Sequence, residues 1–124
     1  MSFDEKALYN QEGLNVEEAL SYLGSMDLYR EILYDYYADI DSKTEAVRKA
    51  IAERDAKAYT VEVHAIKSSS RMIGASDLSQ RAAMLEQYGD SEDWESILRE
   101  TDGVLETYGS YKSIVAPYMV KSED

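Results

Sequence analysis

The chain has 124 residues, of which 44% are hydrophobic, one is proline and none is cysteine. This length suffices for one domain with a core of its own, and the absence of cysteine excludes disulfides and thiolate metal sites. The 25 acidic residues outnumber the 13 basic ones, and the formal net charge of -12 argues against nucleic-acid binding, because binding phosphates requires a basic surface.

Helix is the predicted secondary structure throughout. There are only six glycines, and no alternation of β-branched residues is longer than residues 59–63. We expect a single domain with a polar entry segment at residues 1–12, a helical bundle at 13–118 and a tail at 119–124. No apolar run reaches the roughly 20 residues that span a bilayer, and the N-terminus lacks the features of a signal peptide. We therefore expect a soluble, cytoplasmic protein without membrane insertion.

The N-terminal part predicts one short helix. Residues 1–12 are polar and weakly periodic, and form either a frayed entry segment or a short docking helix. Asn15, with Glu18 three residues later, matches a capping box. The helix that it opens is expected to run through Tyr22 and to end at Gly24.

A long helix is expected from Asp27, its predicted N-cap, through Ile51. Its apolar residues recur at spacings of three and four, with Thr44 at the position between Ile40 and Val47. These apolar residues are Tyr29, Leu33, Tyr36, Ile40, Val47 and Ile51. A bend is expected near residues 39–42. Asp39 and Asp41 have the spacing of calcium-loop ligands, but the loop glycine and the closing glutamate are missing, so we expect no calcium site.

The next predicted helix contains the only histidine, His64, between its N-cap Asp55 and the closing Gly74. At about 100° per residue, three other side chains lie within about 60° of His64 around the helix axis: Ser68, Lys67 and Arg71. The apolar side of the helix points the other way and carries Tyr59, Val63, Ile66 and Ile73, with the small Ser70 among them. We therefore expect an exposed imidazole with two cations on the same face.

Two further helices complete the predicted bundle. One runs from Ser76 to Tyr88 and ends at Gly89, and the other begins at Ser91. Their inward residues recur at spacings of three and four: Leu78, Ala82 and Leu85 in the first, and Ile97, Thr101, Val104, Tyr108, Tyr111, Val115 and Tyr118 in the second. Four such stripes with short connections predict an all-α fold, an antiparallel up-down-up-down four-helix bundle with an additional short N-terminal helix or helices.

The run from His64 to Gly74 resembles the signature of the histidine phosphotransfer (HPt) domain of bacterial and fungal two-component phosphorelays. That signature is approximately His-x-(Leu/Ile)-Lys-Gly-(Ser/Ala)-(Ser/Ala)-x-x-(Ile/Leu)-Gly. The positions that match it are His64, Ile66, Lys67, Ser69, Ser70, Ile73 and Gly74. Ser68 stands where the family usually has glycine. A weaker similarity extends to Gly13–Leu14, Leu28–Leu33 and Leu85–Glu86, and so covers most of the chain.

The resemblance implies a phosphoryl carrier. Such a domain would accept a phosphoryl group on His64 from a receiver aspartate or a kinase, and pass it to the aspartate of a response-regulator receiver domain. The carrier itself is expected to need no ATP, metal or cofactor, with Mg²⁺ in the partner receiver. Protein histidines titrate near neutrality, so an exposed imidazole can attack phosphorus. The cations of Lys67 and Arg71 are expected to stabilise the phosphoryl charge.

The expected partners are a response-regulator receiver domain and a sensor or hybrid histidine kinase, with the chain itself a monomer. The receiver is expected to dock on small and apolar residues beside the histidine, namely Ala65, Ser68 and Met72. Glu86, with Gln87 next to it, stands where the family often has a polar residue near the histidine. Glu86 either orients the imidazole by accepting its N–H or is a solvated helix acid.

Two other functions remain open from the residues alone. A binding module could dock a receiver domain or another protein by the same face without being phosphorylated. A small helical enzyme would need buried polar groups, and the inward stripes offer mainly tyrosine hydroxyls and Thr101. Metal catalysis lacks a second histidine or any cysteine, and a Ser-His-Asp triad through Ser68 lacks an evident oxyanion site.

Overall fold

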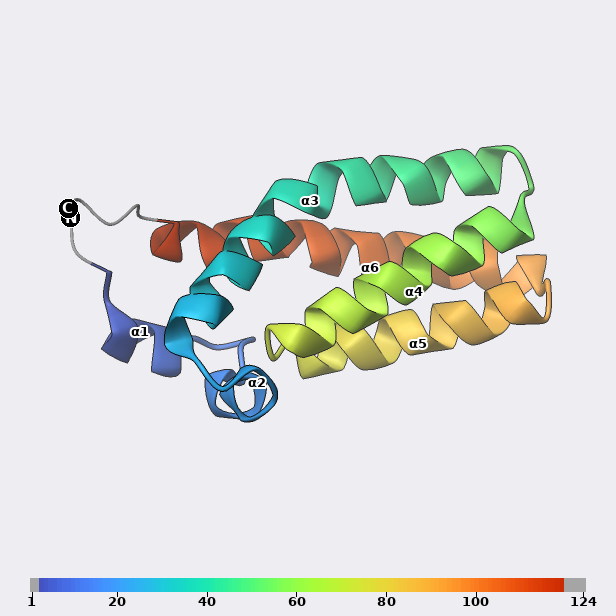
Figure 1. Ribbon diagram of the computed structural model, residues 1–124. Coiled ribbons are helices and arrows are strands. Elements are labelled where there is room, and N and C mark those ends of the chain that lie inside the picture. The colour runs from blue at the N-terminus through green and yellow to red at the C-terminus, as the bar shows by residue number, and fades with distance from the viewer. Residues whose placement is uncertain (1–2, 120–124) are drawn as a thin grey trace.

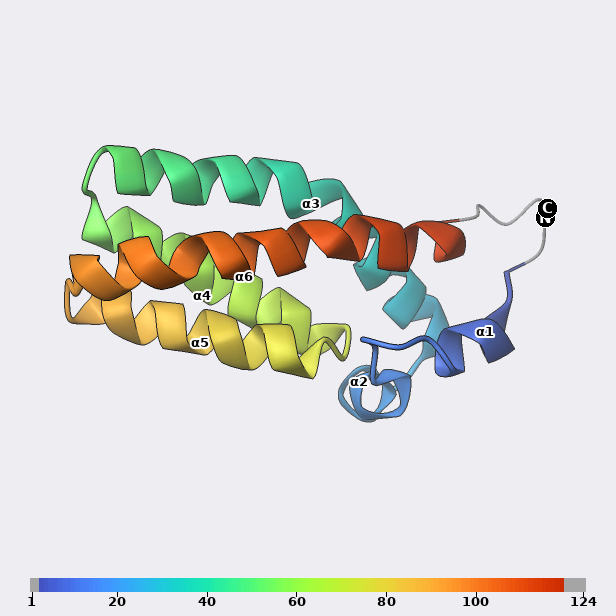
Figure 2. The ribbon, with the colours of Figure 1, turned by 180° about the vertical axis from the view of Figure 1, so that it is seen from behind.

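The computed structural model describes residues 3–119, and this part of the chain is helical without any strand (Figure 1). Its elements are α1 Glu5–Tyr9, α2 Val16–Leu23, α3 Met26–Ala52, α4 Ala56–Met72, α5 Ser76–Asp90, α6 Trp94–Val115 and the 3₁₀ turn η1 Ala116–Tyr118. The long helices α3 to α6 run up, down, up and down side by side, as Figures 1 and 2 show from opposite sides. The predicted all-α antiparallel four-helix bundle is therefore confirmed.

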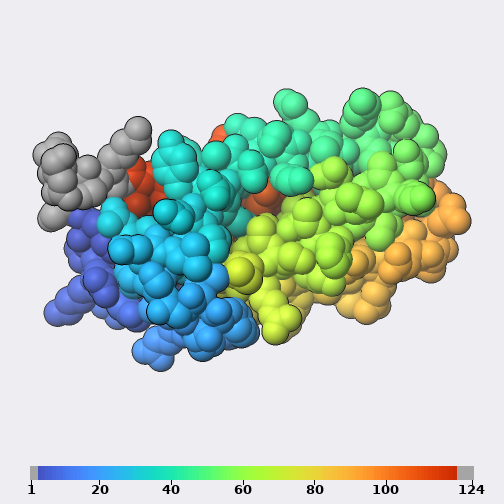
Figure 3. Space-filling model, viewed as in Figure 1, coloured from blue at the N-terminus to red at the C-terminus, as the bar shows by residue number. Residues whose placement is uncertain are grey.

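The short helices α1 and α2 lie at one end of this bundle, and α2 packs against the beginning of α3 and the end of α4 (Figures 1 and 3). Within the expected polar entry segment, Leu8 is fully buried, and Gln11 accepts a hydrogen bond from the Tyr118 hydroxyl at 2.7 Å. The entry segment is thus a short docked helix. Of the expected tail at 119–124, residues 120–124 lie outside the described residues. No helix within residues 3–119 has the length and apolarity that crossing a membrane requires.

Side-chain caps explain where the helices begin. The carboxylate of Asp55 accepts a hydrogen bond from the backbone N–H of Ala58 at 3.0 Å, as predicted for the start of α4. The predicted capping box is also present, because Asn15 accepts from the Glu18 N–H at 3.1 Å and its amide donates to the Glu18 carboxylate. Gly24 ends α2 with the left-handed φ of 78°.

Two predicted helix starts were wrong by a few residues. The N-cap of α3 is Ser25 and not Asp27, which lies in the first turn where a negative charge faces the positive end of the helix dipole. The N-cap of α6 is Asp93 and not Ser91. The hydroxyl of Ser91 instead donates to the carbonyl oxygen of Gln87, and so belongs to the end of α5. The α3 ribbon is continuous and bent (Figure 1), as was expected.

Gly89 does not end α5, contrary to prediction, and is buried inside that helix. A Cβ atom at this position would overlap the Thr60 hydroxyl and lie 3.2 Å from the ring of Tyr59, both on α4. The glycine therefore allows α4 and α5 to approach closely, which helix-end rules do not reveal. The chain reverses after α5 at Glu92, a non-glycine residue with a φ of 53°.

The predicted apolar stripes form the core. The stripe residues of α4, α5 and α6 are all buried, and on α3 only Thr44 and Ile51 are half-buried. Several hydroxyl groups of these stripes form hydrogen bonds with other parts of the fold. Three pairs join different elements: the Tyr36 hydroxyl with Ser70 at 2.9 Å, the Tyr59 hydroxyl with Thr101 at 2.6 Å, and the Tyr29 hydroxyl, which donates to the Ile73 carbonyl at 2.8 Å.

These buried tyrosines predict an alkaline limit to stability. Burial raises the pKa of Tyr59 from 10.0 to about 12, and burial also raises the pKa of Tyr29, Tyr36 and Tyr108. An unfolded chain loses these protons near pH 10, whereas the folded chain keeps them. The contribution of the protonated buried tyrosines to folding stability is therefore complete below pH 10, and it is lost as the pH rises through about 12.

The measurement is a pH titration that follows helix content by circular dichroism and tyrosinate by its absorbance. We expect the tyrosinate of the buried rings to form together with the loss of helix. Complete tyrosine ionisation in a chain that keeps its full helix content would contradict this prediction.

Candidate functional site

His64 lies on the outward face of α4, and 55% of its side chain is exposed. The residues at positions 63 and 66 are buried, so the helix is held from its other face and the ring points into solvent. The imidazole is thus on the outside of the bundle, where another protein can reach it.

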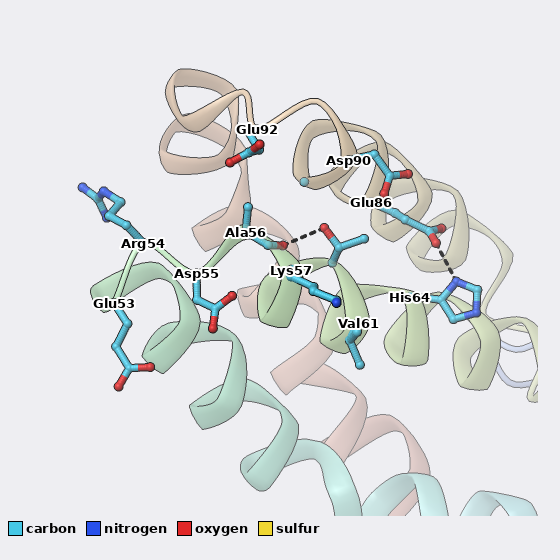
Figure 4. Close-up of a pocket in the computed structure, with 12 residues that line it drawn as sticks. Glu53, Arg54, Asp55, Ala56, Lys57, Val61, His64, Glu86, Asp90 and Glu92 are labelled. Carbon is cyan, nitrogen blue, oxygen red and sulfur yellow. Dashed lines mark hydrogen bonds and ion pairs between the residues drawn. The ribbon is translucent and has the colours of Figure 1, made fainter.

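Glu86 on α5 contacts both His64 and Lys67. One carboxylate oxygen, Oε2, lies 2.6 Å from Nδ1 of His64, and the other accepts a hydrogen bond from Nζ of Lys67 at 2.5 Å. Figure 4 shows the carboxylate of Glu86 directed at the imidazole. Only 20% of the Glu86 side chain is exposed. Of the two interpretations left open by the sequence, the structure therefore shows the carboxylate in contact with the imidazole.

The charge of this carboxylate determines which ring nitrogen is free. Burial raises the pKa of Glu86, but the hydrogen bonds and charges of Lys67 and His64 outweigh burial and leave that pKa below its usual value. An ionised carboxylate can only accept hydrogen bonds, so Nδ1 of His64 must carry the proton between them. In the neutral ring, the lone pair is then on Nε2, on the solvent side.

A hydrogen bond and a tight turn join α5 to α4 near this cluster. The buried Ser79 hydroxyl donates to the backbone carbonyl of Lys67 at 2.9 Å. Gly74 makes the turn between the helices with a φ of 84°, as predicted, and its carbonyl accepts from the Asn15 N–H at 2.8 Å. A Cβ at Gly74 would overlap the Asn15 backbone. The turn that brings Glu86 alongside His64 thus depends on a residue without a side chain.

Arg71 was expected to stand beside His64, but the structure places its guanidinium elsewhere. Its central carbon lies 5.2 Å from the ring centroid of Tyr22 on α2, a cation–π contact. The Tyr22 hydroxyl in turn donates to the carboxylate of Glu18 at 2.7 Å. The sequence could not show this contact, because the packing of α2 against the end of α4 is a tertiary feature. Lys67 is therefore the expected cation that the structure joins to His64, through Glu86.

The remaining predicted contact residues are distributed around the histidine. Ser68 and Gln87 are exposed, and Ala65 and Met72 are half-buried. Val61 was not predicted as part of the site, and it is 60% exposed one turn before His64. The sequence pattern could have revealed it, because Val61 is an apolar residue three positions before His64 that does not belong to the buried face of the helix. Val61, Ala65 and Ser68 thus lie within about one turn of His64 on α4, and Met72 lies about two turns away.

An open hollow of about 850 Å³ extends from His64 and Glu86 along the groove between α4 and α5 (Figure 4). Its charged lining residues, besides Glu86, are Glu53, Arg54, Asp55, Lys57, Asp90 and Glu92. Within residues 3–119, no three His, Asp or Glu side chains gather closely enough to hold a metal ion. The arrangement therefore provides a nucleophilic lone pair on Nε2 of His64 that faces solvent, and the Glu86–Lys67 ion pair lies on the Nδ1 side of the ring.

Comparison with known proteins bears on this site. The sequence model of the family described as "Hpt domain" matches residues 31–110, more than half of the chain and all of α4 and α5. Comparison with curated proteins and with solved structures gave no match. The matched segment contains His64, Lys67 and Glu86. The chain therefore belongs to the Hpt domain family, whose members act as phosphoryl carriers in phosphorelays.

Proposed function

We propose that this protein is a phosphorelay carrier in the cytoplasm that takes a phosphoryl group onto Nε2 of His64 and passes it to the aspartate of a response-regulator receiver domain. The donor is another receiver aspartate or a histidine kinase. The observation that carries this proposal is the exposed imidazole whose Nδ1 is held by the ionised Glu86. Membership of the Hpt family supports the class of reaction.

The transfer requires little chemistry from the carrier itself. The Nε2 lone pair of His64 attacks phosphorus, the P–O bond of the donor aspartyl phosphate breaks, and the donor keeps that electron pair as a carboxylate. Transfer to the next receiver reverses these steps on another aspartate. Positioning and charge neutralisation lower the barrier of such reactions, and a Mg²⁺ ion of the receiver would supply part of both.

Lys67 is the residue of this chain that we assign to the phosphoryl charge. Its ammonium group is one helical turn from His64 and already contacts the carboxylate that holds the ring. A phosphoryl group on Nε2 would add roughly two negative charges beside it. Arg71 is two turns from His64 and would have to leave the ring of Tyr22 to contribute. We therefore assign Arg71 a secondary role in contacting the partner.

The receiver would dock around the histidine, over Ala65, Ser68 and Met72, with Gln87 at the margin. Partly exposed small and apolar groups of this kind suit a transient protein contact, because they lose little solvation when covered. Ser68, in the place of the usual glycine, would lie under the docked receiver. No ATP, metal or other cofactor is assigned to the carrier.

The test is phosphate transfer from a phosphorylated receiver domain. We expect the wild-type chain to gain phosphate that is labile in acid and stable in base, as a phosphoramidate is and a phosphoserine is not. Because the chain contains one histidine, a phosphohistidine identified in it can only be at His64. Phosphate that survives acid, or no phosphate with any receiver tried, would contradict the proposal.

A further inference from the structure

We propose that Glu86 retains the proton on Nδ1 of the phosphorylated ring, and thereby keeps the phosphoryl group of His64 in a labile form that is ready for transfer. This inference rests on the proposed function and deepens it, because it concerns how long the phosphohistidine lasts and at which pH it is lost. It assigns that property to a carboxylate on the neighbouring helix α5.

The geometry of Glu86 restricts the carboxylate to this role. Both of its oxygens are in use, one on Nδ1 of His64 at 2.6 Å and the other on the ammonium of Lys67 at 2.5 Å. Its side chain is four-fifths covered. Rotation away from the ring would break the contact with Lys67 and leave a partly buried charge without its partner, which is costly. The carboxylate is therefore held against Nδ1.

The formation of the N–P bond makes this contact important. Attack through Nε2 uses the lone pair of the neutral ring, so a ring that keeps its Nδ1 proton becomes a phosphorylated imidazolium with a positive charge. A negative charge within hydrogen-bond distance favours the charged form of such a group. Glu86 therefore retains the proton up to a higher pH than a neutral neighbour would.

The retained proton determines the quality of the leaving group. In the forward transfer, a carboxylate oxygen of the receiver aspartate forms a P–O bond, the N–P bond breaks, and its electron pair returns to Nε2. With the proton on Nδ1, the ring leaves as neutral imidazole. Without that proton it would leave as an imidazolate anion, which is a much poorer leaving group. An ionised Glu86 therefore favours rapid loss of the phosphoryl group, both to a receiver and to water.

Other charged groups face the same hollow but do not contact the ring in this way. Lys67 shares the carboxylate, and the further groups are Glu53, Arg54, Asp55, Lys57, Asp90 and Glu92. Asp90 lies one turn beyond Glu86 on α5 and carries the same charge in the same hollow. It therefore offers a matched control, because its removal changes the local field without changing the contact at Nδ1.

The experiment compares wild type with Glu86→Gln and Asp90→Asn. Each protein is loaded with phosphate from potassium phosphoramidate, freed from the donor, and followed for loss of phosphate across a range of pH. Glutamine has the size of glutamate, but its amide can accept from a protonated Nδ1 or donate to an unprotonated one. We expect the phosphohistidine of Glu86→Gln to last about tenfold longer above neutral pH, and its pH profile to move to lower pH by about one unit.

Asp90→Asn is expected to stay within about twofold of wild type, because exposed charges a turn away are screened. Nitrogen NMR of the loaded imidazole provides a second readout, in which the Nδ1 proton of Glu86→Gln is lost at lower pH than that of wild type. Equal lifetimes and equal pH profiles for wild type and Glu86→Gln would overturn the inference while leaving His64 as the phosphorylated residue. Failure of the wild type to take up any acid-labile phosphate would overturn the proposed function and this inference together.

Discussion

The His64→Gln variant is expected to carry no acid-labile phosphate after incubation with a phosphorylated receiver domain that labels the wild type fully. The glutamine amide nitrogen has no lone pair available for attack on phosphorus, and the chain contains no second imidazole. Glutamine can still donate a hydrogen bond to Glu86, so the contact between α4 and α5 is preserved. The measurement is acid-labile phosphate on each protein, separated from the receiver.

The His64→Gln variant also distinguishes a phosphoryl carrier from a docking module that is not phosphorylated. We expect His64→Gln to bind the receiver with nearly the affinity of wild type and to lose less than about 1 kcal/mol of stability, because the side chain is exposed. Helix content and a denaturation curve provide the folding control. Labelling equal to wild type would remove His64 from the mechanism. Receiver binding by both proteins with phosphate on neither would favour a docking module without chemistry.

The Gly74→Ala variant is expected to lose roughly 2 to 5 kcal/mol of stability. An L-residue in the left-handed region costs about 1–2 kcal/mol, and Gly74 has a φ of 84°. The new methyl group would also overlap backbone atoms of Asn15, which cannot rotate away as a side chain can. Overpacking of this kind adds about 1–3 kcal/mol. The measurement is the free energy of unfolding in denaturant.

Gly24→Ala is the matched control for this prediction. Gly24 has a similar φ of 78°, but no atom lies within 4 Å of the position where a Cβ would be. We expect this variant to lose only the backbone term of about 1–2 kcal/mol. Equal losses in the two variants would mean that the contact between the α4–α5 turn and Asn15 contributes nothing beyond the glycine conformation.

Local features of the sequence were sufficient for most of the fold. The caps at Asn15 and Asp55, the helix-ending glycines at positions 24 and 74, and the inward stripes were all predicted, because each depends on residues within about one or two helical turns. The outward position of His64 follows from the same periodicity. Where two polar residues compete as caps, as Ser91 and Asp93 do, local spacing is not sufficient.

The contacts of the site itself were less accessible to such reasoning. The sequence left Glu86 as either a partner of the imidazole or a solvated acid, and placed Arg71 next to His64. Which occurs depends on how closely α5 and α2 approach α4, and that spacing is determined by packing at Gly89 and at the Asn15–Gly74 contact. A Cβ that is absent or a ring from another helix leaves no periodic pattern along the chain.

By itself, the sequence determined that this protein is an all-helical bundle with its one imidazole turned to solvent, because helical periodicity separates a buried face from an exposed one. Only the tertiary structure decided that a carboxylate from α5 binds Nδ1 of His64 and Lys67 together, and that Arg71 instead rests on Tyr22. Those pairings join residues from different helices. Their distances are determined by how the helices pack, and not by spacing along any one of them.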